Sequence, residues 1–301
     1  MYGLFIITRN RPQILIETIR VIQKQTLPPQ TILVVDNSDN SDTENMLFAL
    51  NDNKLQYHKM GYNAGPAGGA IIGMNTLFKQ GFEWVVWGDD DDPPQFDNVI
   101  ENLFNVVPRI SIQTIGIIGA VGVKFLPQKA KTLRVQDDNL IGVVEVDNVA
   151  GGMMPLIHRN VFNNNVLPDA SLFFGFEELD FCLSVKRAGL KIVVSGEEML
   201  RHRQLFGRIG MARTAYKVKN KNALWREYYS TRNLLHILLR KEKSPMGVIA
   251  LTLRSFAKMI YGFRFVFDYG KRNFYYLGKG ISDGYLKNMG MTVVPMNKIN
   301  S

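Results

Sequence analysis

The first 90 residues alternate unbroken apolar runs with segments in which apolar side chains recur every three or four positions. The run at residues 3–8 is typical of a buried strand, and residues 12–25 place Leu15, Ile19 and Ile22 on one helical face. The same pattern predicts further strands at residues 31–35, 54–60 and 83–87, and a helix at residues 65–78. Strands and helices in this alternation predict an α/β fold with a mostly parallel sheet and helices on both faces.

The second half changes character twice. Residues 110–157 read as short strands and turns, and residues 172–188 carry acids that lead into a helix. From about residue 201 the chain becomes basic and aromatic, with helices expected at residues 223–239 and 248–267. We therefore predict a catalytic domain over residues 1–222 and a basic, aromatic helical region over residues 223–301.

Charge follows the same division. Residues 1–200 hold 16 Lys and Arg against 23 Asp and Glu, whereas residues 201–301 hold 20 against 4. The net charge of +9 thus belongs to the last third, which suggests a polyanionic partner, either phosphates or an anionic membrane surface. A solvated basic face explains most of these residues equally well.

We expect a cytoplasmic protein without a spanning helix. The chain has a single cysteine, Cys182, and no recognisable secretory signal, and charges interrupt its apolar run at residues 246–267.

Polar clusters follow three of the predicted strands. They are Thr8-Arg9-Asn10, Asp36-Asn37 and Asp89-Asp90-Asp91-Asp92. Because ligands of such sheets bind beyond the carboxyl ends of the strands, we expect the three clusters to share one crevice. Four adjacent carboxylates repel one another, and a divalent cation with oxygen ligands would neutralise them and hold a diphosphate. A solvated acidic loop is the alternative, and the position after a buried strand favours the metal.

Further candidates are less specific. Glu177, Glu178 and Asp180 lie among aromatic residues, where desolvation would create a general base, although acids also favour a helix N-terminus. His202 stands between two arginines and is a candidate metal ligand, although a lone His is more often incidental. Residues 61–69 form a glycine-rich turn that suits either a phosphate or tight helix packing.

In this order, the segments of residues 3–235 resemble the family 2 inverting glycosyltransferases of the GT-A fold. Residues 4–11 look like the opening strand, whose threonine and the residue after it, here Thr8 and Arg9, touch the nucleotide. Residues 34–38 are similar to the second strand end, whose acid, here Asp36, binds the base or ribose. The resemblance further implies donor contacts from Asn63, Gly65, Asp89 and Asp90.

The metal and the base also follow from this resemblance. Residues 89–91 match the Asp-X-Asp motif, which implies a Mn or Mg ion on Asp91, with Asp89 and His202 as further ligands. Residues 176–180 resemble the Glu-Asp motif, whose second acid is the catalytic base. That position is Glu178, where Asp is usual, so the choice between Glu177 and Glu178 stays open. The implied reaction is a single displacement with inversion.

Within the family, residues 65–69, 87–94 and 228–233 look most like the galactofuranosyl- and rhamnosyltransferase branch. The resemblance implies a UDP- or dTDP-linked sugar donor and a glycan or polyprenyl-diphosphate-linked acceptor in cell-surface polysaccharide synthesis. Another UDP-sugar, such as glucose, galactose or GlcNAc, is the alternative donor. The expected acceptor contacts are Gly151, Gly152, Asp180, Tyr229 and Arg232.

The C-terminal region offers a stripe of apolar residues at helical spacing. Its members are Ile249, Leu253, Phe256, Ile260 and Phe263. We interpret it as packing on the catalytic domain or on a second subunit, with docking to the inner membrane face as the competing hypothesis.

Two other functions are weighed against the transferase. A sugar nucleotidyltransferase would need an early basic glycine-rich loop, and a nucleic-acid-binding protein would leave the clustered carboxylates unexplained. We therefore expect no nucleic acid partner and leave a homo-oligomer open.

Overall fold

The computed structural model describes residues 1–150, 154–211 and 220–294. These residues form two compact units, each with its own core. Unit 1 comprises residues 1–124, 134–170 and 178–211, and unit 2 comprises residues 125–133, 171–177 and 212–301.

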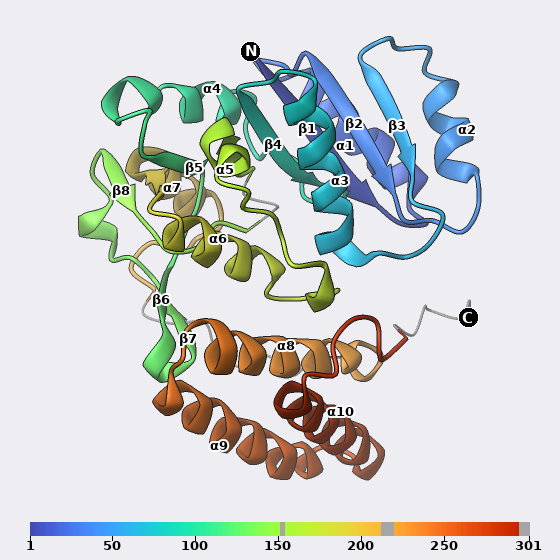
Figure 1. Cartoon of the computed structure of the whole chain (residues 1–301), viewed down its shortest axis with the longest axis vertical. Helices are drawn as coiled ribbons and strands as arrows, with labels where there is room; N and C mark the ends of the chain where they lie inside the picture. The colour runs from blue at the N-terminus through green and yellow to red at the C-terminus, as the bar shows by residue number, and fades with distance from the viewer. Residues whose placement is uncertain (151–153, 212–219, 295–301) are drawn as a thin grey trace. The chain divides into compact units, whose positions relative to one another are not determined.

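Unit 1 is built on an eight-stranded sheet whose strand order is β3-β2-β1-β4-β9-β5-β10-β8 (Figure 1). The parallel pairs are β1 with β2, β1 with β4, β2 with β3, and β5 with β10, whereas β8 and β9 run antiparallel to their neighbours. The mostly parallel α/β fold predicted from the sequence is confirmed. The strands are β1 (Tyr2–Thr8), β2 (Thr31–Asp36), β3 (Leu55–Lys59), β4 (Trp84–Asp89), β5 (Ile115–Gly119), β8 (Val143–Glu145), β9 (Leu156–His158) and β10 (Lys191–Ser195).

Helices cover both faces of this sheet because successive strand residues point to opposite sides. Phe5 and Ile7 pack with α3 and α6, whereas Leu4 and Ile6 pack with α1 and α4. The helices of unit 1 are α1 (Pro12–Gln23), α2 (Asp42–Phe48), α3 (Gly65–Lys79), α4 (Val99–Phe104), α5 (Arg159–Asn163), α6 (Glu177–Arg187, whose first residue belongs to unit 2) and α7 (Gly196–Leu205).

Unit 2 is mainly helical, as the sequence predicted for the C-terminal third. It contains α8 (Trp225–His236), continued by a π-helical turn at Ile237–Lys241, then α9 (Pro245–Tyr261) and α10 (Phe267–Leu286). The expected helix at residues 248–267 therefore ends earlier, and α10, which the sequence reading omitted, packs against both α8 and α9 (Figure 1). A small sheet pairs β6 (Lys124–Leu126) with β7 (Lys131–Leu133).

Candidate active site

Three strand ends meet at one edge of the sheet. Thr8 at the end of β1 pairs in register with Asp36 at the end of β2. Ile7, one residue earlier, pairs with Asp89 at the end of β4. Parallel neighbours bring these polar ends together, so the clusters converge as the strand order led us to expect.

The carboxylates after β4 differ in their surroundings. Asp90 is buried, and it accepts hydrogen bonds from Thr8 Oγ1 at 2.7 Å and from Arg11 Nη2 at 2.5 Å. Its backbone oxygen accepts a hydrogen bond from Thr18 Oγ1 at 2.7 Å. Asp91 is half exposed and forms an ion pair with the other arm of Arg11. Asp90 therefore ties the acidic turn to β1 and α1, whereas Asp91 faces the solvent side.

Electrostatic interactions link a glutamate and a histidine that are distant in sequence to these carboxylates. Burial, followed by the charge of Glu178 and then by those of Asp90, Asp91 and Asp92, raises the pKa of Asp89 to about 7. Burial and the charge of Asp91 also raise the pKa of Asp92, while the nearby His202 lowers it. Glu178 and His202 thus lie close enough to interact with the carboxylates that follow β4.

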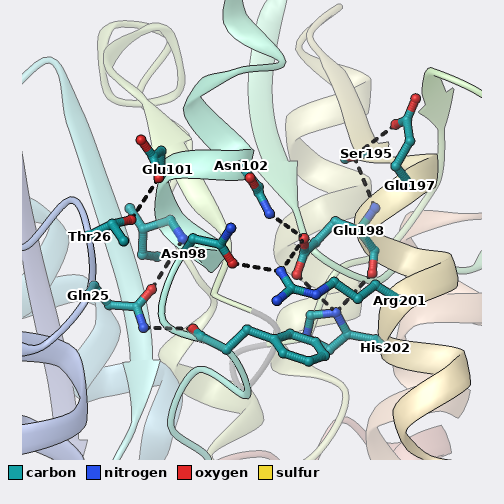
Figure 2. Close-up of polar contacts among 12 residues, drawn as sticks. Gln25, Thr26, Asn98, Glu101, Asn102, Ser195, Glu197, Glu198, Arg201 and His202 are labelled. Atoms are coloured by element: carbon teal, nitrogen blue, oxygen red, sulfur yellow. Dashed lines mark hydrogen bonds and ion pairs between the residues drawn. The ribbon is translucent and has the colours of Figure 1, made fainter.

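The ring of His202 is held in one orientation. Its Nδ1 lies 2.9 Å from the backbone oxygen of Glu198, one helical turn earlier on α7, and 3.3 Å from that residue's carboxylate (Figure 2). A carbonyl oxygen only accepts, so Nδ1 carries a proton, and Nε2 is the ring nitrogen that could serve as a ligand. The Phe96 ring meets His202 edge-on, with centroids 5.3 Å apart.

Hydrogen bonds from neighbouring residues hold Glu198 in place. Asn102 Nδ2 donates to its carboxylate at 2.7 Å, and Ser195 Oγ accepts from its backbone N–H at 3.2 Å. Arg201 donates to Asn98 Oδ1 at 2.6 Å, so Asn98 and Asn102 both connect the α4 segment to α7 beside the histidine (Figure 2). Such outer contacts orient a metal-ligating imidazole.

These residues fit a divalent cation. Carboxylate oxygens with raised pKa values would be relieved by a positive ion, and an imidazole with a free Nε2 is a common ligand for Mn²⁺. Among residues 1–150, 154–211 and 220–294, no group of three or more His, Cys, Asp or Glu side chains is arranged to hold a metal by itself. A cation here would therefore need ligands from a bound diphosphate as well.

The end of β2 carries a second cluster of polar residues. Asp36 is fully buried and accepts from the backbone N–H of Ser38 at 2.8 Å and from Tyr57 O–H at 3.0 Å. Arg9, at the end of β1, lies 3.5 Å from Asp39 in a salt bridge. Arg9 and Asp36, which were both predicted to contact the donor, thus lie at the ends of adjoining strands.

The glycine-rich turn at residues 61–69 is hydrogen-bonded to Asn37, the residue after β2. Asn37 accepts from the backbone N–H of Ala64 at 3.1 Å, and Asn63 accepts from that of Gly65 at 3.2 Å. Further along α3, a Cβ on Gly69 or Gly73 would lie within 3 Å of Ile7 or Phe5. Close packing of α3 on β1 therefore requires the later glycines, whereas Asn63 and Gly65 lie at the turn itself.

Glu177 and Glu178 begin α6. Glu177 is buried and Glu178 is half-buried, and the charge of Glu178 reaches Asp89. Asp180, in the first turn, is also buried. The acids therefore occupy a helix N-terminus, as one interpretation expected, and Glu178 interacts with the carboxylate cluster, whereas the role of general base stays a prediction.

Within unit 2, two residues of α8 form hydrogen bonds with the segment that precedes α6. Asn233 Nδ2 donates to the backbone oxygens of Leu172 at 2.8 Å, Phe174 at 2.9 Å and Gly175 at 2.7 Å. Arg232 Nη2 also donates to the oxygen of Leu172, at 2.8 Å. We call Arg232 and Asn233 the carbonyl clamp. The sequence reading noted the motif at residues 228–233 but did not assign this role.

The expected acceptor contacts have varied surroundings. Arg232 and Tyr229 are fully buried, and the Tyr229 O–H donates to the backbone oxygen of Val293 at 2.5 Å. A role in holding unit 2 together suits both side chains better than contact with an acceptor. Gly151 and Gly152 lie outside the described residues. Arg11, which the sequence reading left unassigned, emerges as the cation that pairs with Asp90 and Asp91.

Comparison with known proteins shows what the first half of the chain is similar to. The profile of "Glycosyl transferase family 2" matches residues 4–143. The galactofuranosyltransferase GlfT1 of Mycobacterium tuberculosis, in strains CDC 1551 / Oshkosh and ATCC 25618 / H37Rv, is 32% identical over 108 residues. That match covers 36% of this chain and 36% of theirs, so it spans about a third of the length of these relatives.

Two solved structures share the fold. The mannosyltransferase PcManGT from Pyrobaculum calidifontis, in complex with GDP-Man and Mn²⁺, has a TM-score of 0.55 at 13% identity, covering 95% of this chain and 87% of that one. GalNAc-T7 with UDP, GalNAc and Mn²⁺ has a TM-score of 0.51 at 14% identity, covering 65% and 42%. Both likenesses concern the fold alone. Residues 4–143 therefore match the model of glycosyl transferase family 2, and the chain shares its α/β fold with these two glycosyltransferase structures.

Proposed function

We propose that this chain transfers galactofuranose, or failing that rhamnose, with inversion from a nucleotide diphosphate donor to a glycan or lipid-linked glycan. The observation that carries the proposal is the meeting of Thr8, Asp36 and the Asp89–Asp92 carboxylates at adjoining strand ends, with Glu178 and His202 in electrostatic reach. The likeness to GlfT1 over 108 residues supports the choice of sugar.

The donor would lie along the strand ends. Asp36, fixed by Ser38 and Tyr57, offers a rigid acceptor for base or ribose hydroxyls, and Thr8 and Arg9 lie beside it. Asn63 and Gly65 would approach the sugar nucleotide from the turn before α3. The diphosphate would then extend toward the carboxylates after β4.

Asp91 and His202, with Asp89 nearby, would hold a Mn²⁺ or Mg²⁺ ion. When bound, such an ion neutralises the charge that develops on the departing nucleoside diphosphate. Arg11 at present neutralises Asp90 and Asp91 within the chain, so its release of Asp91 would accompany metal binding. His202 needs no such change, because its Nδ1 proton is already bound to the oxygen of Glu198.

Glu178 is the proposed catalytic base, and Glu177 the alternative. The carboxylate of Glu178 would take the proton of an acceptor hydroxyl while that oxygen bonds to the anomeric carbon and the bond to the diphosphate breaks. Glu178 is half-buried and interacts with Asp89, whereas Glu177 is buried. The accessible acid beside the carboxylate cluster is therefore the better base.

Unit 2 contains a hollow of about 450 Å³ suited to an anionic acceptor. Its lining includes Lys131, Arg254 and Lys258, countered by Glu227, together with the ring of Phe176 immediately before the two glutamates. Three cations against one acid favour a phosphate-bearing ligand. This charge balance supports a lipid-diphosphate-linked acceptor for the same reaction.

The test is a donor panel measured by thermal shift. UDP-, dTDP- and GDP-linked sugars are each added with and without Mn²⁺, and the transfer product with the best donor is analysed by NMR. We expect UDP-galactofuranose with Mn²⁺ to raise the melting temperature most and the product to have the inverted anomeric configuration. Asp91→Asn should remove the Mn²⁺-dependent part, whereas Asp138→Asn, on an exposed aspartate elsewhere in unit 1, should not. Equal behaviour of the two variants would refute the assignment.

A further inference from the structure

Helix α9 leaves one long face without a partner. Met246, Ile249, Leu253, Phe256 and Ile260 recur at steps of three and four, and each has between 50% and 73% of its surface exposed. The opposite face is buried against the rest of unit 2, through Val248, Leu251, Ser255 and Met259. We call the exposed residues the α9 stripe. Within the residues that the structure describes, the stripe is therefore not covered by this chain, and the expected packing on a second subunit stays a prediction.

The link from α9 to α10 extends this surface. Tyr261, Phe263, Phe265, Val266 and Phe267 are all exposed within seven consecutive residues, and we call them the apolar tip. Their rings contact each other, as in Tyr261–Phe265 with centroids 5.5 Å apart and Phe263–Phe267 at 5.9 Å. Monomeric soluble proteins rarely expose so many large apolar side chains in one place, and such a surface marks an interaction site.

Positive charge surrounds these apolar residues. Residues 240–287 carry ten Lys and Arg against three Asp and Glu, a net charge of +7. Two of the cations lie directly over rings of the tip, since Arg264 is 5.6 Å from the centroid of Tyr261 and Lys271 is 5.1 Å from that of Phe267. Aromatic rings beside cations are typical of segments that lie at the level of lipid headgroups.

The charge decides between two occupants of the face. Two copies of a segment whose cations outnumber its acids by seven would repel one another, whereas an anionic bilayer would attract it. A lipid surface also accommodates exposed apolar side chains flanked by cations. An anionic membrane is therefore the occupant that the observations favour.

The helix cannot simply cross the membrane. Residues Pro245–Arg264 are long and apolar enough to do so by length and composition. However, Arg254 donates to the backbone oxygens of Lys129 at 2.7 Å and Ala130 at 3.0 Å, and Lys258 pairs with Glu227 at 3.1 Å. Insertion across a bilayer would break these contacts and strip the buried face from α8 and α10.

We propose that unit 2 docks on an anionic lipid bilayer, with the apolar tip and the α9 stripe entering the headgroup and upper acyl region. Arg264 and Lys271 then contact lipid phosphates from the flanks of the tip. The helix lies in the plane of the interface. This proposal does not rest on the transferase reaction, because the contacts that carry it all lie in unit 2.

Vesicle flotation of the full chain tests the proposal. Vesicles of phosphatidylglycerol mixed with phosphatidylcholine should bind the protein, vesicles of phosphatidylcholine alone should bind it weakly, and added salt should release it. The double variant Val266→Ser/Phe267→Ser should bind at least about tenfold more weakly because it removes two inserted side chains. A second variant, Leu253→Ser/Ile260→Ser, tests the stripe. Phe48→Ser is the matched control, since Phe48 on α2 of unit 1 is 67% exposed and Phe267 is 66% exposed.

Three results would overturn the proposal. One is equal flotation of the wild type and both double variants while circular dichroism shows them folded. Another is a dimer by light scattering that both double variants abolish, with no binding to anionic vesicles, which would assign the face to a second copy. The third is resistance of the bound protein to extraction with alkaline carbonate, which would indicate a spanning helix. None of these measurements uses a sugar donor, so the transferase assignment stands or falls separately.

Discussion

Replacing Asn233 by Ala removes the centre of the carbonyl clamp. The side chain donates to the backbone oxygens of Leu172, Phe174 and Gly175. The oxygen of Leu172 keeps its bond from Arg232, so two carbonyls lose this donor. A hydrogen bond contributes about 1 kcal/mol, and a buried group left without a partner costs up to about 3 kcal/mol. We therefore expect the free energy of unfolding to fall by about 2 to 6 kcal/mol.

The same substitution should slow the reaction. Phe173, Gly175 and Phe176 have φ values of 60°, 80° and 67°, and left-handed backbone at the two phenylalanines costs about 1 kcal/mol each. Such a conformation persists only where surrounding contacts hold it. Because this segment leads directly into Glu178, its relaxation would displace the base, and a shift of about 1 Å costs on the order of 100-fold in kcat. The donor Kd should not change, since the donor contacts lie in unit 1.

Three measurements check this prediction. Urea unfolding reports the loss in stability, steady-state kinetics at saturating donor reports kcat, and calorimetry reports the donor Kd. Asn53→Ala serves as the control, because Asn53 is exposed and makes no side-chain hydrogen bond within the described residues. A kcat equal to that of the wild type, or a parallel loss of donor affinity, would show that the clamp does not position the base.

Three further predictions concern unit 1. Glu178→Gln should lower kcat by about 10²- to 10⁴-fold while leaving the thermal shift caused by the donor unchanged, and a retained kcat would exclude this residue as the base. His202→Ala should abolish the Mn²⁺-dependent part of the donor thermal shift without changing the small shift seen with chelator, and an unchanged Mn²⁺ dependence would remove it from the ligand set. The backbone N–H of Gly210, followed by the Arg203 guanidinium, holds the pKa of Asp137 below its usual range. Stability from this carboxylate is therefore present above about pH 4 and is lost as the pH falls through the depressed folded pKa, so Asp137→Asn should lower the melting temperature at pH 7 and converge with the wild type in acid.

The sequence predicted the elements whose pattern is regular. The strands at residues 3–8, 31–35 and 83–87 are confirmed within one or two residues, because long apolar runs followed by polar clusters have few other interpretations. Helix α10 was missed, since its exposed tyrosines and phenylalanines blur the apolar periodicity and four glycines interrupt it. Helix α2 is only seven residues long and carries too few apolar positions to stand out.

The candidate site was predictable only in part. Residues at strand ends were found because topology alone brings them together, as with Thr8 and Asp36. Arg11 was not singled out, because its pairing with Asp90 depends on a turn whose course the sequence does not reveal. The resemblance implied that Arg232 contacts an acceptor, whereas in the structure its guanidinium is buried among backbone oxygens, a contact that the sequence does not reveal.

The four adjacent aspartates can be sorted by what each contacts. Asp90 is buried, and its two carboxylate oxygens accept hydrogen bonds from Thr8 and Arg11. It therefore stabilises the turn and is poorly placed to bind a ligand. Asp91 is half exposed and pairs with Arg11, a half-exposed cation that an incoming metal could replace without disturbing the sheet. Asp89, at the strand end, feels both its neighbours and Glu178. Arg11 therefore relieves the repulsion at Asp90 and Asp91. A cation bound with a diphosphate would lower the electrostatic energy most at Asp89, which also interacts with the charge of Glu178.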